Sequence, residues 1–122
     1  EGGADPGEDA LACAKRELAE ETGLRAVSFQ RVLEMDLSNS ITDERAVIFV
    51  ATELTPGAAQ PDATEVLRHR RAPFLEVLAR VADGRIRDSL TVAAVLRAHH
   101  MAVTGKLPAA LTQAMLRQAQ GE

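Results

Sequence analysis

Residues 2–24 read GGADPGEDALACAKRELAEETGL and decide how the chain folds. The stretch opens on Gly, Pro and acidic residues, a composition typical of a loop. From Asp9 to Thr22 apolar residues recur at spacings of three and four, which predicts an amphipathic helix. Asp5 or Asp9 is suited to cap the start of this helix, and Gly23 is suited to the left-handed residue that ends many helices.

An acidic cluster lies on the predicted helix. Glu17, Glu20 and Glu21 stand at i, i+3 and i+4, so their carboxylates project from one side of the helix. Carboxylates this close repel one another unless a cation or a proton compensates, and oxygen-only ligands suit a hard divalent ion such as magnesium or manganese. Arg16 directly precedes Glu17, so we expect it to pair back toward the loop, with Glu8, rather than to neutralise the cluster. The alternative interpretation is a solvated acidic helix face.

The whole pattern resembles the Nudix box, Gly-x5-Glu-x7-Arg-Glu-U-x-Glu-Glu-x-Gly-U, where U is a bulky aliphatic residue. All nine specified positions match over residues 2–24. They are Gly2, Glu8, Arg16, Glu17, Leu18, Glu20, Glu21, Gly23 and Leu24. The resemblance implies an α/β fold, an α/β/α sandwich with a mixed sheet, and a hydrolase of a nucleoside diphosphate linked to another moiety.

The resemblance also implies a role for each side chain of the box. Glu17, Glu20 and Glu21 would be catalytic ligands of a divalent metal, Mg2+ or Mn2+. Structural support of the box would come from Gly2, Glu8, Arg16 and Gly23. Because the first strands of the family precede the box, we expect this chain to be an N-terminally truncated Nudix domain.

The order along the chain is loop, helix, strands and then helices, which reads as α/β or α+β in one domain over residues 1–122. Strands are predicted at residues 26–37, 46–54 and 65–70, and helices at 73–81, from 88 or 89 onward, and at 107–118. Residues 46–54 are almost continuously apolar, which suits a strand buried on both faces.

Three further stretches are similar to the ADP-ribose pyrophosphatase branch of the family: the entry loop at residues 2–9, the Ser-rich loop at 38–44, and the Gly-x-Ile-x-Asp-x-x-Thr pattern at 84–91. This likeness implies ADP-ribose or a nucleotide sugar as substrate and a homodimeric enzyme. It also implies a catalytic Glu from a later loop, for which Glu44 and Glu65 compete. The alternative for each is a plain surface Glu.

Two other functions stay open at this point. One is a Nudix-fold module that binds or regulates without turnover, although such modules usually lose box carboxylates and this chain retains them all. The other is a pyrophosphatase that removes damaged nucleoside triphosphates.

The composition of the chain argues against several classes of binding partner. The net charge of −4 argues against gripping nucleic acid by bulk charge, and the apolar runs are far shorter than the roughly 20 residues that span a bilayer. The chain has no Trp or Tyr and only three Phe, so it offers little surface for base stacking.

The lone Cys13 excludes an internal disulfide, fits a reducing cytoplasm, and is expected to be a small core residue. His99 and His100 lie near a predicted helix end, where a cation is favourable, and we do not expect them to be catalytic.

Overall fold

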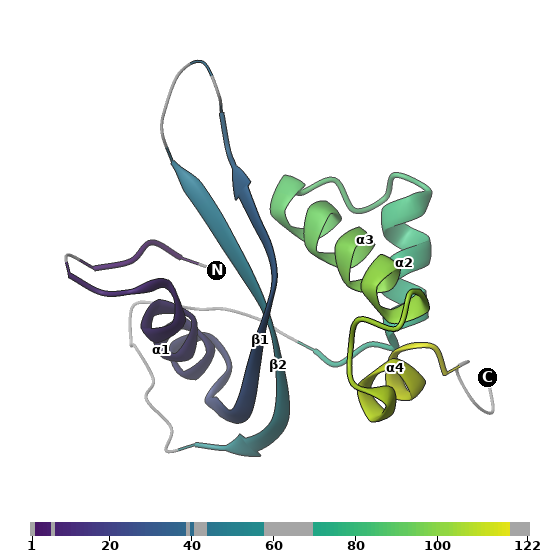
Figure 1. Cartoon of the computed structure of the whole chain (residues 1–122), viewed down its shortest axis with the longest axis horizontal. Helices are drawn as coiled ribbons and strands as arrows, with labels where there is room; N and C mark the ends of the chain where they lie inside the picture. Colours follow the sequence, from purple (N-terminus) through teal and green to yellow (C-terminus); the bar gives the residue numbers. More distant parts are fainter. Residues whose placement is uncertain (1, 6, 39, 41–43, 58–69, 118–122) are drawn as a thin grey trace. The chain divides into compact units, whose positions relative to one another are not determined.

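The computed structural model describes residues 2–5, 7–38, 40, 44–57 and 70–117. The elements follow one another as α1 (Ala10–Thr22), β1 (Leu24–Asp36), β2 (Arg45–Pro56), α2 (Phe74–Ala82), α3 (Ser89–Val103) and α4 (Ala109–Met115) (Figure 1). The chain divides into two compact units. The first joins Glu1–Arg31 to Phe49–Arg70, and the second joins Val32–Ile48 to Arg71–Glu122.

Both ends of α1 are fixed by the residues that flank it. The Oδ1 of Asp9 accepts a hydrogen bond from the backbone N–H of Ala12 at 2.7 Å, so Asp9, rather than Asp5, is the N-cap. Gly23 has φ 71° and ψ 11°, and its N–H donates to the carbonyl of Ala19 at 2.9 Å. The predicted helix and its glycine stop are confirmed. Cys13 is buried, as expected of a small core residue.

β1 and β2 form a two-stranded hairpin. The N–H of Leu37 donates to the carbonyl of Glu44 at 3.0 Å near the turn, and the N–H of Gly57 donates to the carbonyl of Gly23 at 2.7 Å at the far end. The expectation that the second strand is buried on both faces is wrong, because residues 46–52 are only half-buried. Two paired strands leave these apolar side chains partly uncovered. The strand predicted at 65–70 lies outside the described residues except for Arg70, which belongs to no helix or strand.

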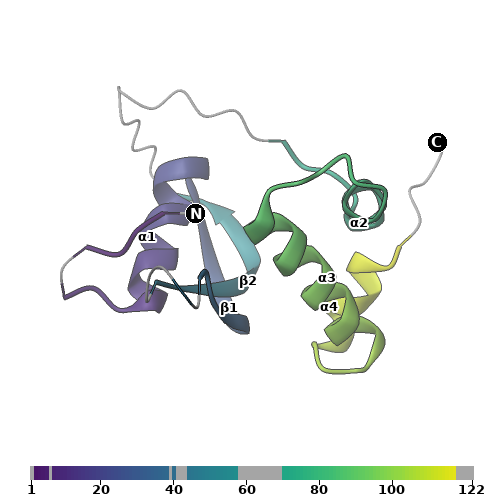
Figure 2. The same ribbon diagram turned by 90° about the horizontal axis from the view of Figure 1, so that it is seen from above.

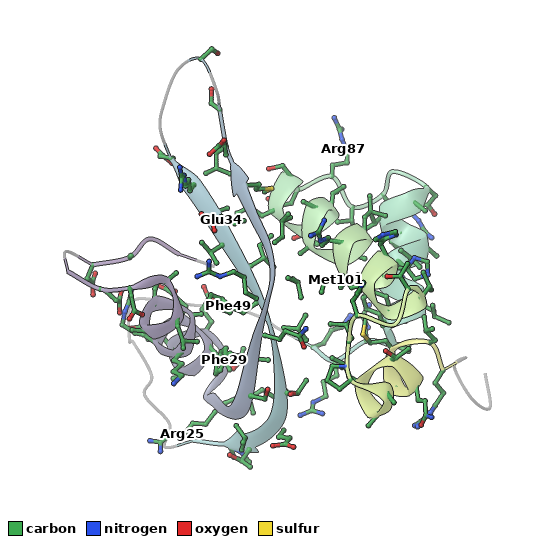
Figure 3. The ribbon with its side chains drawn as sticks, viewed as in Figure 1. Arg25, Phe29, Glu34, Phe49, Arg87 and Met101 are labelled. Atoms are coloured by element: carbon green, nitrogen blue, oxygen red, sulfur yellow. The ribbon has the colours of Figure 1, made fainter. Side chains whose placement is uncertain are left out.

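Two of the three phenylalanines pack the first unit. The rings of Phe29 on β1 and Phe49 on β2 meet edge to face, with centroids 6.3 Å apart and planes at 81° (Figure 3). The Lys15 Nζ of α1 lies 5.9 Å from the centroid of the Phe29 ring, and the Arg31 guanidinium lies at the same distance from Phe49. These rings therefore serve the hydrophobic packing of the hairpin, with a cation beside each ring.

In the second unit α3 lies beside α2 and α4 (Figures 1 and 2). The buried side chains of the second unit are Val32, Val81, Ala98, Ala102, Leu107 and Met115. α2 is displaced by one residue from the predicted 73–81, since Pro73 is its N-cap. Of the two predicted caps of α3, Asp88 is the one observed. α4 is shorter than the predicted 107–118 and begins only after Pro108. No helix within the described ranges is long and apolar enough to cross a bilayer.

The Gly-x-Ile-x-Asp-x-x-Thr stretch forms the turn between α2 and α3. Gly84 has φ 87°, a left-handed conformation that glycine adopts without strain, and the N–H of Ile86 donates to the carbonyl of Arg80 at 2.9 Å. The Oδ2 of Asp88 accepts from both the N–H of Thr91 at 3.0 Å and its hydroxyl at 2.8 Å. This local pattern therefore has a folding role, since it stops one helix and starts the next.

We expect Gly23→Ala to lower the free energy of unfolding by about 1 kcal/mol, because a Cβ disfavours the left-handed φ of 71°. No atom lies within 4 Å of the added Cβ, so the loss comes from the backbone rather than from a clash. Urea unfolding measures it. Gly3→Ala is the matched control, because its Cβ also meets no atom and its φ is outside the left-handed region. Equal destabilisation by the two changes would contradict this explanation.

Candidate active site

The guanidinium of Arg16 is the centre of the site. Its Nε donates to Glu8 Oε2 at 2.9 Å and its Nη2 donates to Glu8 Oε1 at 3.0 Å, a two-point pair that fixes both side chains. The Nη2 also donates to the carbonyl of Gly3 at 3.1 Å. Glu8 in turn accepts the backbone N–H of Asp5 at 2.9 Å. Arg16 thus ties the entry loop to α1, and its predicted pairing with Glu8 is confirmed.

Arg16 also reaches the acidic cluster. Its Nη1 donates to Glu17 Oε1 at 3.0 Å and to Glu20 Oε2 at 3.1 Å. The expectation that Arg16 would not neutralise the cluster is therefore wrong. The loop engages only two of the three guanidinium nitrogens, so the third remains available to the helix. One cation is shared among Glu8, Glu17 and Glu20.

The shared guanidinium changes the acid–base behaviour of its neighbours. The hydrogen bond from Arg16, with a second from the Asp5 backbone, lowers the pKa of Glu8 from 4.5 to about 2. Pairing with Glu8 raises the pKa of Arg16 further above its usual range, so the arginine stays charged. Burial, with the negative charge of Glu8, raises the pKa of the Cys13 thiol. Cys13 is therefore kept as a neutral packing residue rather than a nucleophile.

Gly2 gives room to the carboxylate of Glu17. A Cβ added to Gly2 would overlap Glu17 Oε1 and lie only 2.7 Å from Oε2. Any larger residue at this position must displace the carboxylate or the loop. The first glycine of the box is thus required by a close approach of backbone to side chain.

The donors around Arg16 fit a divalent cation in their chemistry. Glu17 and Glu20 contact the same Nη1, so their oxygens are no further apart than the sum of those two contacts, and carboxylate oxygens are the ligands that Mg2+ and Mn2+ prefer. Among the described residues, no three His, Cys, Asp or Glu side chains are grouped closely enough to share an ion, so the three box carboxylates are not gathered into one set of ligands. A cation at Glu17 and Glu20 would have to share them with Arg16. The assignment of all three as metal ligands stays a prediction.

The two candidates for a catalytic base have different positions. Glu44 directly precedes β2, where it is exposed and its backbone carbonyl closes the hairpin. Glu65 lies outside the described residues. Sequence reasoning missed the contributions of the Gly3 carbonyl and the Asp5 N–H, because backbone groups carry no residue signature.

The comparisons with known proteins identify the family of the chain. Residues 1–97 match the family model of the NUDIX domain, and the chain therefore belongs to the Nudix family. It is 38% identical over 85 residues to a GDP-mannose pyrophosphatase of Yersinia pestis. This alignment covers 66% of this chain and 42% of that protein. It is 33% identical over 100 residues to an ADP-ribose pyrophosphatase of Mycobacterium tuberculosis, covering 76% and 46%.

A solved structure is also similar to this one. The crystal structure of an ADP compounds hydrolase superposes with a TM-score of 0.71 at 26% identity, over 84% of this chain and 56% of that one. The predicted Nudix family and α/β fold class are confirmed. The chain spans less than half the length of each of these two curated relatives.

We expect Glu8→Gln to reduce the loss of stability on acidification. Because the folded-state pKa of Glu8 is about 2, against 4.5 ordinarily, its carboxylate stabilises the fold fully above about pH 4.5, and this stabilisation is lost as the pH falls toward 2. The advantage of the wild type over the variant should therefore shrink across that window in urea unfolding at stepped pH.

Glu53→Gln is the control for this titration, since it removes an exposed carboxylate for which the described residues show no ion pair. An advantage of the wild type over Glu8→Gln that stays constant from pH 5 to pH 2 would contradict the role of the Arg16–Glu8 pair.

Proposed function

We propose that the protein is a metal-dependent pyrophosphatase that hydrolyses the pyrophosphate bond of a nucleoside diphosphate linked to another moiety, with ADP-ribose or a nucleotide sugar such as GDP-mannose as substrate. The observation that carries this proposal is the Arg16 cluster, which holds the entry loop of a complete Nudix box against its carboxylate helix. The names of the relatives support the substrate class. We further propose that residues 1–122 form a single Nudix domain with the box at 2–24.

The roles of the side chains follow from their chemistry. Glu17, Glu20 and Glu21 would hold Mg2+ or Mn2+, which when bound neutralises phosphate charge and lowers the pKa of a coordinated water. Arg16 and Glu8 keep the loop closed, so that Glu17 stays against Gly2. Glu44 or Glu65 would act as the general base and take the proton of the attacking water onto a carboxylate oxygen.

The partners are a small nucleotide and a second copy of the chain. On α3, Leu96 is 46% exposed and Val103 is 55% exposed, and their spacing of seven residues puts both on one helix face. An apolar face of this kind supports the proposal of a homodimer. With a net charge of −4 and few aromatic rings, the chain is poorly suited to nucleic acid as a partner.

A hydrolysis screen in the presence of Mg2+ tests the function directly. Its substrates are ADP-ribose, GDP-mannose and an oxidised nucleoside triphosphate, and release of the mononucleotide is followed. We expect turnover of a diphosphate-linked substrate and little of the triphosphate. Binding of all three without turnover would favour a regulatory module, and a preference for the triphosphate would favour a sanitising enzyme.

Within this function, Glu20→Gln or Glu21→Gln should lower kcat on the order of 10²-fold, because each removes a carboxylate charge from the site of the cation. Glu76→Gln is the matched control: Glu76 pairs with Arg80 at 3.2 Å, at the same i,i+4 spacing as the Arg16–Glu20 pair, but on α2. Near-normal turnover of both box variants would contradict the proposed cation site.

A further inference from the structure

An open hollow of about 520 Å³ lies in the second unit, outside the Nudix box. Its lining is formed by Arg97, His100, Met101, Thr104 and Lys106. The first four are at i, i+3, i+4 and i+7 along α3 and its C-cap, and therefore share one helix face. No acidic side chain lines this hollow within the described part of the chain. In a protein of net charge −4, two cationic side chains, Arg97 and Lys106, meet at this hollow.

A hydrogen bond at one edge of the guanidinium orients the Arg97 side chain. Its Nε donates to the backbone carbonyl of Val32 at 3.0 Å. Neither terminal nitrogen of Arg97 has a partner among the described residues, so the free edge of the group is left for a ligand. A guanidinium edge presents two parallel N–H donors, which match two oxygens of a phosphate or carboxylate group.

The C-terminus of α3 does not cancel this positive charge. The carbonyls that would present negative charge there already accept hydrogen bonds from the turn that follows. The N–H of Thr104 donates to His100 at 3.0 Å, that of Gly105 to Ala102 at 3.3 Å and that of Lys106 to Met101 at 2.8 Å. Gly105 makes the turn possible with φ 76°. Because these backbone donors satisfy the carbonyls, the side chain of Arg97 is not required to cap the helix.

We propose that this hollow binds a phosphate group, either inorganic phosphate or the phosphate of a small monoester. Arg97 and Lys106 supply the charge, and a phosphate monoester carries close to two negative charges at neutral pH, against one on a carboxylate. Met101 supplies an apolar wall beside the cations, and the hollow has room for more than the phosphate alone. Four of the five lining residues follow residue 97, where the match to the NUDIX domain ends, so the family match assigns them no role.

The test is a titration of the isotope-labelled protein followed by 1H–15N NMR, with inorganic phosphate in one arm and ribose 5-phosphate in another. A chelator removes divalent ions, so that phosphate cannot bind at the box through a metal, and sodium chloride keeps the ionic strength constant. We expect saturable shifts of the Arg97 Nε–H and the Lys106 amide signals. Equal affinities for the two ligands would mean that the hollow recognises the phosphate group alone. Tighter binding of ribose 5-phosphate would mean that Met101 also contacts the rest of the ester.

Two charge-removing variants and a control complete the design. Arg97→Gln and Lys106→Gln should each weaken binding about tenfold, since each removes a charge-assisted donor. Arg87→Gln makes the same change of net charge at an exposed position of the same unit, outside the hollow, and should leave the affinity unchanged (Figure 3). Arg97→Lys keeps the positive charge but loses the two parallel N–H donors of the guanidinium, so it should bind phosphate with intermediate affinity. It also tests the proposal if Arg97→Gln does not fold.

Shifts that never saturate, or that chloride reproduces at the same concentration, would overturn the proposal. An Arg87→Gln variant that loses as much affinity as Arg97→Gln would also overturn it. The readout is binding without metal or turnover, so its outcome is independent of the proposed hydrolase activity.

Discussion

The pairing of Arg16 with Glu8 is the interaction on which the rest of the first unit depends. Arg16 stands in the middle of α1 and Glu8 at the end of the entry loop, so their two-point contact closes the loop onto the helix. The side chains are only 28% and 15% exposed, which shields the pair from solvent and salt more than an ordinary surface ion pair. Once the loop is closed, Gly2 lies against the Glu17 carboxylate and the Gly3 carbonyl reaches the same guanidinium.

The same guanidinium links folding to chemistry. Nη1 is the nitrogen that the loop does not engage, and it lies between the carboxylates of Glu17 and Glu20. These two carboxylates can therefore be held close together without an external cation. A divalent ion at this position would compete with Nη1 for them, while the contact of Arg16 with Glu8 uses other nitrogens and can persist.

Sequence alone could predict the features that depend on neighbouring residues. The cap at Asp9, the glycine stop at Gly23 and the cap at Asp88 are signals a few residues long, and the structure has each of them. The Glu8 partner of Arg16 was predictable for a related reason, because the box fixes the number of residues between them. Helix spacing likewise put Glu17 and Glu20 on one side of α1.

The remaining features depend on three-dimensional contacts that no short pattern encodes. The apolar run of β2 predicted complete burial, but burial depends on what covers the strand, and residues 46–52 are half-buried. The reach of Arg16 Nη1 to the acidic cluster depends on how the loop engages the rest of the fork. The orientation of Arg97 at the hollow beside α3 depends on a hydrogen bond to the Val32 carbonyl, which is 65 residues away in the sequence. The spacing of Arg97, His100 and Thr104 on one helix face was the signal that sequence reading passed over.

The most direct test of this account is a double-mutant cycle on Glu8 and Arg16, with each residue changed to Gln alone and together. Urea unfolding gives the free energy of unfolding of each variant. If the pair holds the loop against the carboxylate helix, each single change should lower this free energy, and the double change should be little worse than either single change. Additive losses, or single variants of unchanged stability, would contradict the central role of the pair.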